Sequence, residues 1–185
     1  IYLGDTEITS LNDKALTLLR RDRIGFIFQS FNLLPTLTAA ENIVLPLRIA
    51  GRKPDAFWVD SIIDTVGLRE RLHHKPTELS GGQQQRVAIA RAIANEPRIL
   101  MADEPTGNIS TRQGEEIMQT FQELNDAGIP CLTVPHEPEI ARHSRRLVQV
   151  QDGLIIADEE VQDRISARDW LLLHPEQKRI MLNAT

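Results

Sequence analysis

The chain has 185 residues, of which 41% are hydrophobic and 25% charged, and it carries a formal net charge of −5. This length fits one domain with room for a subdomain. The negative charge argues against a general nucleic-acid-binding protein, so we expect no nucleic-acid partner. The single cysteine, Cys131, excludes an internal disulfide. No stretch reaches the roughly 18 apolar residues of a membrane span.

The N-terminal part predicts a hairpin, a helix and a strand. Residues 2–8 have the pattern of a hairpin, and Ser10 can cap a helix that runs to about Arg21. The β-favouring run 24–28 then predicts a buried strand. The sequence opens on Ile1 without an initiator methionine, and we expect it to be the C-terminal part of a longer domain.

The middle of the chain predicts helices and polar loops but no strand. Thr38 and Glu41 have the spacing of a capping box, which starts a helix. Residues 55–66 predict a second helix, and apolar side chains recur with helical spacing over residues 83–95. We therefore predict a helical subdomain over about residues 30–95, inserted in an α/β core.

Strands and helices alternate in the C-terminal half. In chain order the predicted elements are a strand over 99–102, a helix from Ser110 that Gly128 closes, a strand over 131–134, a short helix over 136–143, strands over 147–150 and 154–157, and a helical patch around 170–173. This alternation implies a mainly parallel sheet with helices on its faces, so the predicted fold class is α/β.

The tetrapeptide Ser80-Gly81-Gly82-Gln83 has the composition of an anion-binding turn. Its two glycines let the backbone approach a ligand closely, and the helix that follows presents unpaired N–H groups. The serine hydroxyl adds a donor. A plain Gly-Gly loop before a helix explains the tetrapeptide equally well when it is taken alone.

A pair of carboxylates, Asp103 and Glu104, follows the apolar run 99–102. A strand that ends in a carboxylate delivers it to the sheet's C-terminal edge, where α/β proteins bind their ligands. One carboxylate can hold Mg²⁺, and its neighbour can orient or deprotonate an attacking water. An acidic loop after a core strand is the simpler alternative.

Two further polar residues follow predicted strands. Gln29 could reach a metal or the attacking water, and His136 could hydrogen-bond a phosphate oxygen or that water. An isolated glutamine is more often a surface residue, and a lone histidine is more often structural. The order of the features, from strand-Gln through LSGGQ and strand-Asp-Glu to strand-His, outweighs these simpler interpretations.

With these motifs the sequence resembles the ATP-binding cassette (ABC) ATPases, from Ile1 to about Ile156. The stretches RIGFIFQSFNLLPTLTAAENIVLPL and PTELSGGQQQRVAIARAIANEPRILMADEPTGN look most like the lipoprotein-releasing and macrolide-export branch. The resemblance implies a P-loop NTPase-like core, with a partial ABC ATPase domain over residues 1–157 and a C-terminal tail over 158–185.

The resemblance also implies roles for the residues singled out above. Gln29 would be the Q-loop glutamine, and Leu79–Gln83 the signature motif. Asp103 would be the Walker B aspartate, with Gln29 a second candidate for the metal. Glu104 would be the catalytic glutamate and His136 the switch histidine. The implied cofactors are ATP and Mg²⁺.

The family mechanism places two cassettes head-to-tail over two ATP molecules, so the expected partners are a second cassette, in a homodimer, and an integral-membrane permease. The expected location is the cytoplasmic face of the inner membrane. The loop with Phe31, Leu33 and Leu34 would lie near the groove that receives the permease. Packing of these side chains inside the helical subdomain is an equal alternative.

The sequence departs from the family at three points. It contains no G-x-x-x-x-G-K-S/T loop, which we expect to precede residue 1, so this stretch alone should bind ATP weakly or not at all through its own face. Ser110 stands where the family's D-loop usually has aspartate, and Pro135 precedes His136. A truncated or degenerate cassette that donates only its signature motif to a partner is therefore the alternative to an active ATPase.

Other polar residues carry no predicted chemistry. His73 and His74 have no acid or cysteine at metal-ligand spacing, so we expect no zinc site. Glu115–Glu116 and Asp158–Glu160 are interpreted as solvated faces. Cys131 lies in a predicted buried strand and is interpreted as a packing residue rather than a nucleophile.

Overall fold

A computed structural model describes residues 1–175 of the chain, which separate into two compact units. Unit 1 comprises Ile1–Ile27 and Phe31–Met101, and unit 2 comprises Phe28–Ser30 and the chain from Ala102 onward. The final part of the predicted tail, residues 176–185, lies outside the described residues.

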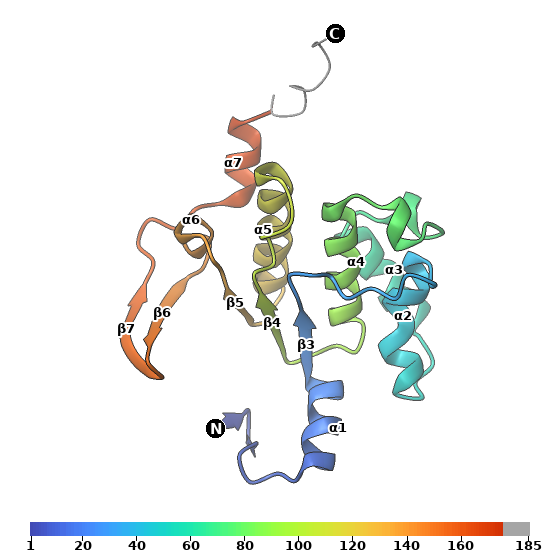
Figure 1. The fold of residues 1–185 in the computed structure, drawn as a ribbon, viewed down its shortest axis with the longest axis horizontal. Coiled ribbons are helices and arrows are strands. Elements are labelled where there is room, and N and C mark those ends of the chain that lie inside the picture. The colour runs from blue at the N-terminus through green and yellow to red at the C-terminus, as the bar shows by residue number, and fades with distance from the viewer. Residues whose placement is uncertain (176–185) are drawn as a thin grey trace. The chain divides into compact units, whose positions relative to one another are not determined.

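The elements of the fold are shown in Figure 1. In chain order they are β1 (Tyr2–Leu3), β2 (Thr6–Glu7), α1 (Asp13–Arg23), β3 (Ile24–Ile27), α2 (Ala39–Ile49), α3 (Ala56–Thr65), two single 3₁₀ turns (Arg69–Arg71 and Pro76–Glu78), α4 (Gly81–Ile93), β4 (Ile99–Asp103), α5 (Thr111–Asp126), β5 (Cys131–Val134), α6 (Pro138–Ala141), β6 (Arg146–Gln151), β7 (Leu154–Glu160) and α7 (Ala167–Leu173).

Three strands form a sheet in the order β3-β4-β5. Helices lie between β3 and β4 and between β4 and β5 in the sequence, and helical crossovers of this kind join parallel strands. The predicted α/β class is therefore confirmed. Two smaller antiparallel pairs are separate from this sheet: β1 with β2, where Tyr2 faces Glu7, and β6 with β7, where Arg146 faces Glu160.

The start of α1 differs from the prediction. Asn12, not Ser10, caps the helix, because the Asn12 side chain accepts a hydrogen bond of 2.9 Å from the Ala15 amide. The Ser10 hydroxyl instead donates to the Glu7 carbonyl at the end of the hairpin. Serine and asparagine are both good caps, so sequence alone could not show which of them the hairpin would engage.

The core of unit 1 is built around α4. Its buried side chains include Val87, Ile89 and Ile93, and α2 packs against it. Strand β3 also lies against α4: a Cβ on Gly25 would stand 2.5 Å from the Ala92 carbonyl oxygen, so only glycine fits there. This packing fixes the direction of the helix that begins at the SGGQ sequence.

The core of unit 2 is formed by the apolar face of α5, and α7 packs against the same helix. The prediction that Glu115–Glu116 is a solvated face is wrong for Glu115 of α5. Its side chain is only 8% exposed, and its Oε2 lies 2.8 Å from Nε2 of His143, which is 1% exposed. The two residues are 28 positions apart in the sequence, so no local sequence pattern could predict their pairing.

Within the part of the chain that the structure describes, no helix is both long enough and apolar enough to cross a membrane.

Candidate functional site

Gln29 and Glu104 are in direct contact in unit 2. The Gln29 amide nitrogen donates a hydrogen bond of 2.8 Å to Oε2 of Glu104, although the two residues are 75 positions apart. Both side chains are half-buried. A hydrogen bond to an ionised group is stronger than a neutral one, so this contact orients the Glu104 carboxylate.

The backbone of Glu104 is held in a strained turn. Its φ of +44° lies in the left-handed region, which costs a residue other than glycine about 1–2 kcal/mol. Two hydrogen bonds stabilise this conformation: the Glu104 amide donates to the Val134 carbonyl at 2.9 Å, and the Gly107 amide donates to the Glu104 carbonyl at 3.1 Å. Strain of this kind persists only where the surrounding structure imposes it, and it often marks functional sites.

Gly107 and Asn108 complete the surroundings of Gln29. A Cβ on Gly107 would stand 2.9 Å from the Gln29 amide nitrogen and 3.4 Å from Oε2 of Glu104, so the absence of a side chain lets these groups meet. The Asn108 amide nitrogen donates to the Gln29 carbonyl at 2.9 Å. The backbone and the side chain of Gln29 are therefore both held by the turn that follows β4.

Asp103 and His136, the other two predicted residues, are both exposed. Asp103 is the last residue of β4, and His136 follows Pro135 just after β5. Within residues 1–175 neither side chain hydrogen-bonds to Gln29 or Glu104. The structure thus joins two of the four predicted catalytic and metal-binding residues, and leaves the other two facing solvent.

The donor set fits a magnesium ion that is shared with a bound phosphate. Carboxylate and amide oxygens are the ligands that Mg²⁺ prefers, and Asp103 and Gln29 supply one of each. Because the Gln29 nitrogen is turned to Glu104, its oxygen is left for another partner. In the described range, no three His, Cys, Asp or Glu side chains gather as a metal cluster. Mg²⁺ sites that use one or two protein ligands together with substrate phosphates need no such cluster.

The SGGQ sequence lies in unit 1, at the start of α4. Ser80 and Gln83 form a capping box: the Ser80 hydroxyl accepts from the Gln83 amide at 3.3 Å, and Oε1 of Gln83 accepts from the Ser80 amide at 2.9 Å. The amides of Gly81 and Gly82 in the first turn have no intrahelical acceptor. An anion at this end would therefore meet two glycine amides and the Ser80 hydroxyl proton.

Comparison with known proteins identifies the family. The family model described as "ABC transporter" matches residues 3–107, more than half of the chain. The chain belongs to the ABC transporter ATP-binding family. The LSGGQ and Asp-Glu motifs already resembled those of this family, and the match confirms the membership.

Individual relatives of this ABC cassette support the same family and indicate its branch. It is 48% identical over 163 residues to the macrolide export ATP-binding/permease protein MacB of Bdellovibrio bacteriovorus, covering 86% of this chain but 25% of that protein. It is 43% identical over 160 residues to the lipoprotein-releasing system ATP-binding protein LolD 1 of Rhodospirillum rubrum, covering 85% of this chain and 71% of that protein. The predicted branch is therefore confirmed.

Solved structures match as well. A dimeric post-hydrolysis state of the cassette MJ0796, bound to ADP and Pi, is 40% identical with a TM-score of 0.75, and the match covers 87% of this chain and 72% of that one. A second dimeric structure of MJ0796, a bacterial ABC transporter cassette, is 41% identical with the same TM-score. At this identity the likeness confirms the cassette fold.

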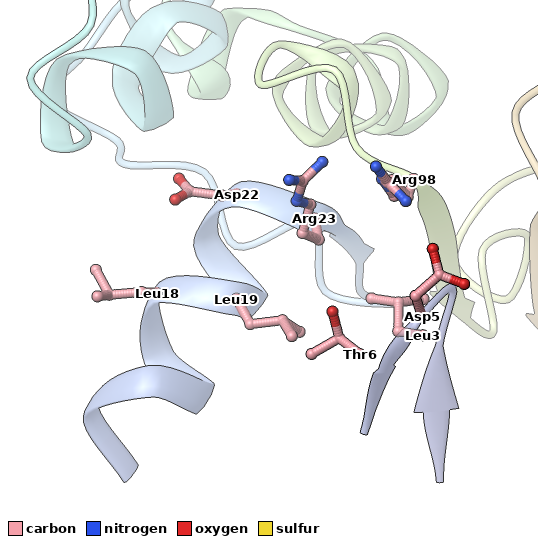
Figure 2. Close-up of a pocket in the computed structure, with 8 residues that line it drawn as sticks. All are labelled: Leu3, Asp5, Thr6, Leu18, Leu19, Asp22, Arg23 and Arg98. Atoms are coloured by element: carbon pink, nitrogen blue, oxygen red, sulfur yellow. The ribbon is translucent and has the colours of Figure 1, made fainter. Parts of the chain in front are cut away.

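A pocket of about 290 Å³ lies elsewhere in unit 1 of the cassette. Figure 2 shows that it opens between the β1–β2 hairpin and helix α1, with the Arg98 side chain at its rim. None of the predicted site residues lines it: the lining residues are Leu3, Asp5, Thr6, Leu18, Leu19, Asp22, Arg23 and Arg98. Asp22, one of the lining residues, pairs with Arg21 and Arg52.

Sequence reasoning missed Gly107 and Asn108 as parts of the site. The only available signal was their position, since Thr-Gly-Asn follows Asp-Glu-Pro directly. Glycine after a carboxylate pair is compatible with any tight turn, so the close approach to Gln29 could not be inferred without the fold.

Proposed function

We propose that this chain is the ATP-hydrolysing cassette of an exporter and that it powers an integral-membrane permease. The observation that carries the proposal is the contact between Gln29 and Glu104, held by a strained turn directly after Asp103. The Gln29 amide orients the Glu104 carboxylate, and the Asp103 carboxylate beside it is exposed. This arrangement is suited to position a water molecule beside a metal-bound phosphate.

Glu104 acts on the attacking water in this proposal. Its Oε2 accepts the hydrogen bond from Gln29, which leaves Oε1 to orient the water and accept its proton. Gln29 keeps the carboxylate in place, and its own side-chain oxygen would be available to a metal. Asp103, exposed at the end of β4, would hold Mg²⁺, which would supply positive charge to the phosphate oxygens. His136 donates a hydrogen bond to the phosphate.

Ser80 to Gln83 serve a second nucleotide, bound by a partner cassette in a head-to-tail homodimer. The unpaired glycine amides and the positive end of the α4 dipole suit a γ-phosphate. Both MJ0796 structures are described as dimeric, which supports this assembly. The name of MacB, an ATP-binding/permease protein, supports a permease partner. The cassette would then act where that permease meets the cytoplasm, at the inner membrane.

The test is Glu104→Gln in the natural full-length protein. The variant keeps the shape of the side chain and its contact with Gln29 but removes the base. We expect ATP turnover to fall at least about 100-fold, within the range for loss of general-base catalysis, while Mg-ATP affinity changes less than about threefold. Glu123→Gln, an exposed position on α5, is the matched control and should turn over ATP normally.

Two results would redirect the proposal. If Glu104→Gln hydrolyses ATP at the rate of the unaltered protein, Glu104 is not the base. If the unaltered protein does not hydrolyse ATP, while Gly81→Asp abolishes hydrolysis by a co-assembled cassette, the chain is the degenerate cassette that donates only its signature motif.

A further inference from the structure

The loop after β3 contains two consecutive residues in the left-handed conformation. Phe31 has φ of +57° and Asn32 has φ of +50°. Asparagine tolerates this region, but for phenylalanine it is unfavourable. Something outside the loop must therefore hold these two residues in place.

Arg91, in the last turn of α4, makes the contacts that do so. Its Nη2 donates to the Phe31 carbonyl at 2.8 Å, and its Nη1 donates to the Asn32 carbonyl. Two successive left-handed residues thus turn both carbonyls toward one guanidinium, whose planar fork binds them together. Burial lowers the pKa of Arg91 from its ordinary value, yet a guanidinium remains charged at neutral pH, so the two hydrogen bonds are charge-assisted.

The other end of the same loop is held by Asn42 of α2. This side chain is fully buried. Its Oδ1 accepts from the Leu34 amide at 2.9 Å, and its Nδ2 donates to the carbonyls of Leu34 and Thr38 at 3.2 and 3.0 Å. Helix α2 packs against α4, so both anchors of the loop belong to one packed pair of helices.

We propose that Arg91 is a positioning residue, which fixes the backbone of loop 31–37 to helix α4 so that this loop and the SGGQ end of α4 form one rigid element. The loop presents Leu34, whose side chain is 45% exposed, and it begins two residues after Gln29 in the chain. Its effect on turnover rests on the proposed function, but the attachment of the loop does not.

Hydrogen–deuterium exchange in the full-length protein tests the attachment. The Leu34 and Leu37 amides are hydrogen-bonded, so they report on the order of the loop. Arg91→Gln should raise their exchange rates at least tenfold, and Arg91→Lys should give a smaller increase because an ammonium cannot reproduce the fork. Arg86→Gln is the matched control, since Arg86 lies on the same helix but donates to the Val66 carbonyl at 2.8 Å. It should leave the exchange of both amides unchanged.

The kinetic readout separates positioning from simple stability. Arg91→Gln should lower kcat at least fivefold with KM for ATP changed less than twofold, and Arg91→Lys should restore part of kcat. Unchanged exchange at Leu34 and Leu37 would overturn the proposal, and so would faster exchange with unaltered kcat. If Arg91→Gln does not fold, Asn32→Val disfavours the left-handed conformation from within the loop and should raise the same exchange rates. An unaltered protein without ATPase activity would refute the proposed function, while the exchange experiment would still decide the attachment.

Discussion

Gly107→Ala is a sharp test of the contact between Gln29 and Glu104. The added methyl group would lie 2.9 Å from the Gln29 amide nitrogen, closer than a Cβ tolerates, so the glutamine must move away. The charge-assisted hydrogen bond to Glu104 is worth about 1.5–3 kcal/mol. Against this, replacing glycine by alanine stabilises by about 0.4–1 kcal/mol through the unfolded state, because the φ of Gly107 is not left-handed.

The net effect should be a loss of about 1–2 kcal/mol in the free energy of unfolding, or roughly 3–6 °C in Tm for a domain of this size. Thermal melting monitored by circular dichroism measures it. Gly114→Ala in α5 is the matched control: its Cβ would stand 3.5 Å from Thr106, an ordinary contact, so it should raise stability by about 0.5–1 kcal/mol.

A double-mutant cycle decides whether the hydrogen bond is the cause. In a Gln29→Met background the bond is already lost, so Gly107→Ala should cost at least about 1 kcal/mol less than it does alone. Equal costs in the two backgrounds, or a Gly107→Ala protein as stable as Gly114→Ala, would refute the reasoning.

Two further predictions concern a buried pair and a half-buried thiol of unit 2. Glu115→Ala should lower the free energy of unfolding in urea by about 3 kcal/mol, because it leaves His143 buried without its carboxylate partner; a loss below about 1 kcal/mol would show that the pair is dispensable. Burial raises the pKa of the Cys131 thiol to about 11, so at pH 8 iodoacetamide should alkylate it at least about 100-fold more slowly than a free cysteine of pKa near 8.5. The rate should rise about tenfold per pH unit up to that pKa, and fast labelling at pH 8 would contradict the burial.

Local signals in the sequence predicted most of the elements of the fold. The capping box at Thr38 is present as expected, and the helix predicted from Ser110 also begins with a capping box, because each box depends only on residues three positions apart. The strand over Cys131–Val134 has the predicted bounds, and Gly128 closes α5 with φ of +96°. The error at Ser10 arose where two adequate caps lay close together and a tertiary contact chose between them.

Contacts between distant residues could not be predicted in the same way. The motif order grouped Gln29 with Glu104, but their hydrogen bond depends on Gly107 and on the left-handed turn, which leave no periodic pattern. Glu115 was misassigned for the same reason, since its partner His143 is distant in the sequence, in the turn after α6. The boundaries of the helical subdomain and the roles of the site residues stay predictions.

The most direct test of the central claim is the identity of the nucleotide that the full-length protein retains after a single turnover with radiolabelled Mg-ATP. If Glu104 is the base that activates water, the unaltered protein will release or hold ADP, while Glu104→Gln will hold intact ATP over the same period. ADP formed by Glu104→Gln at the rate of the unaltered protein would contradict the account.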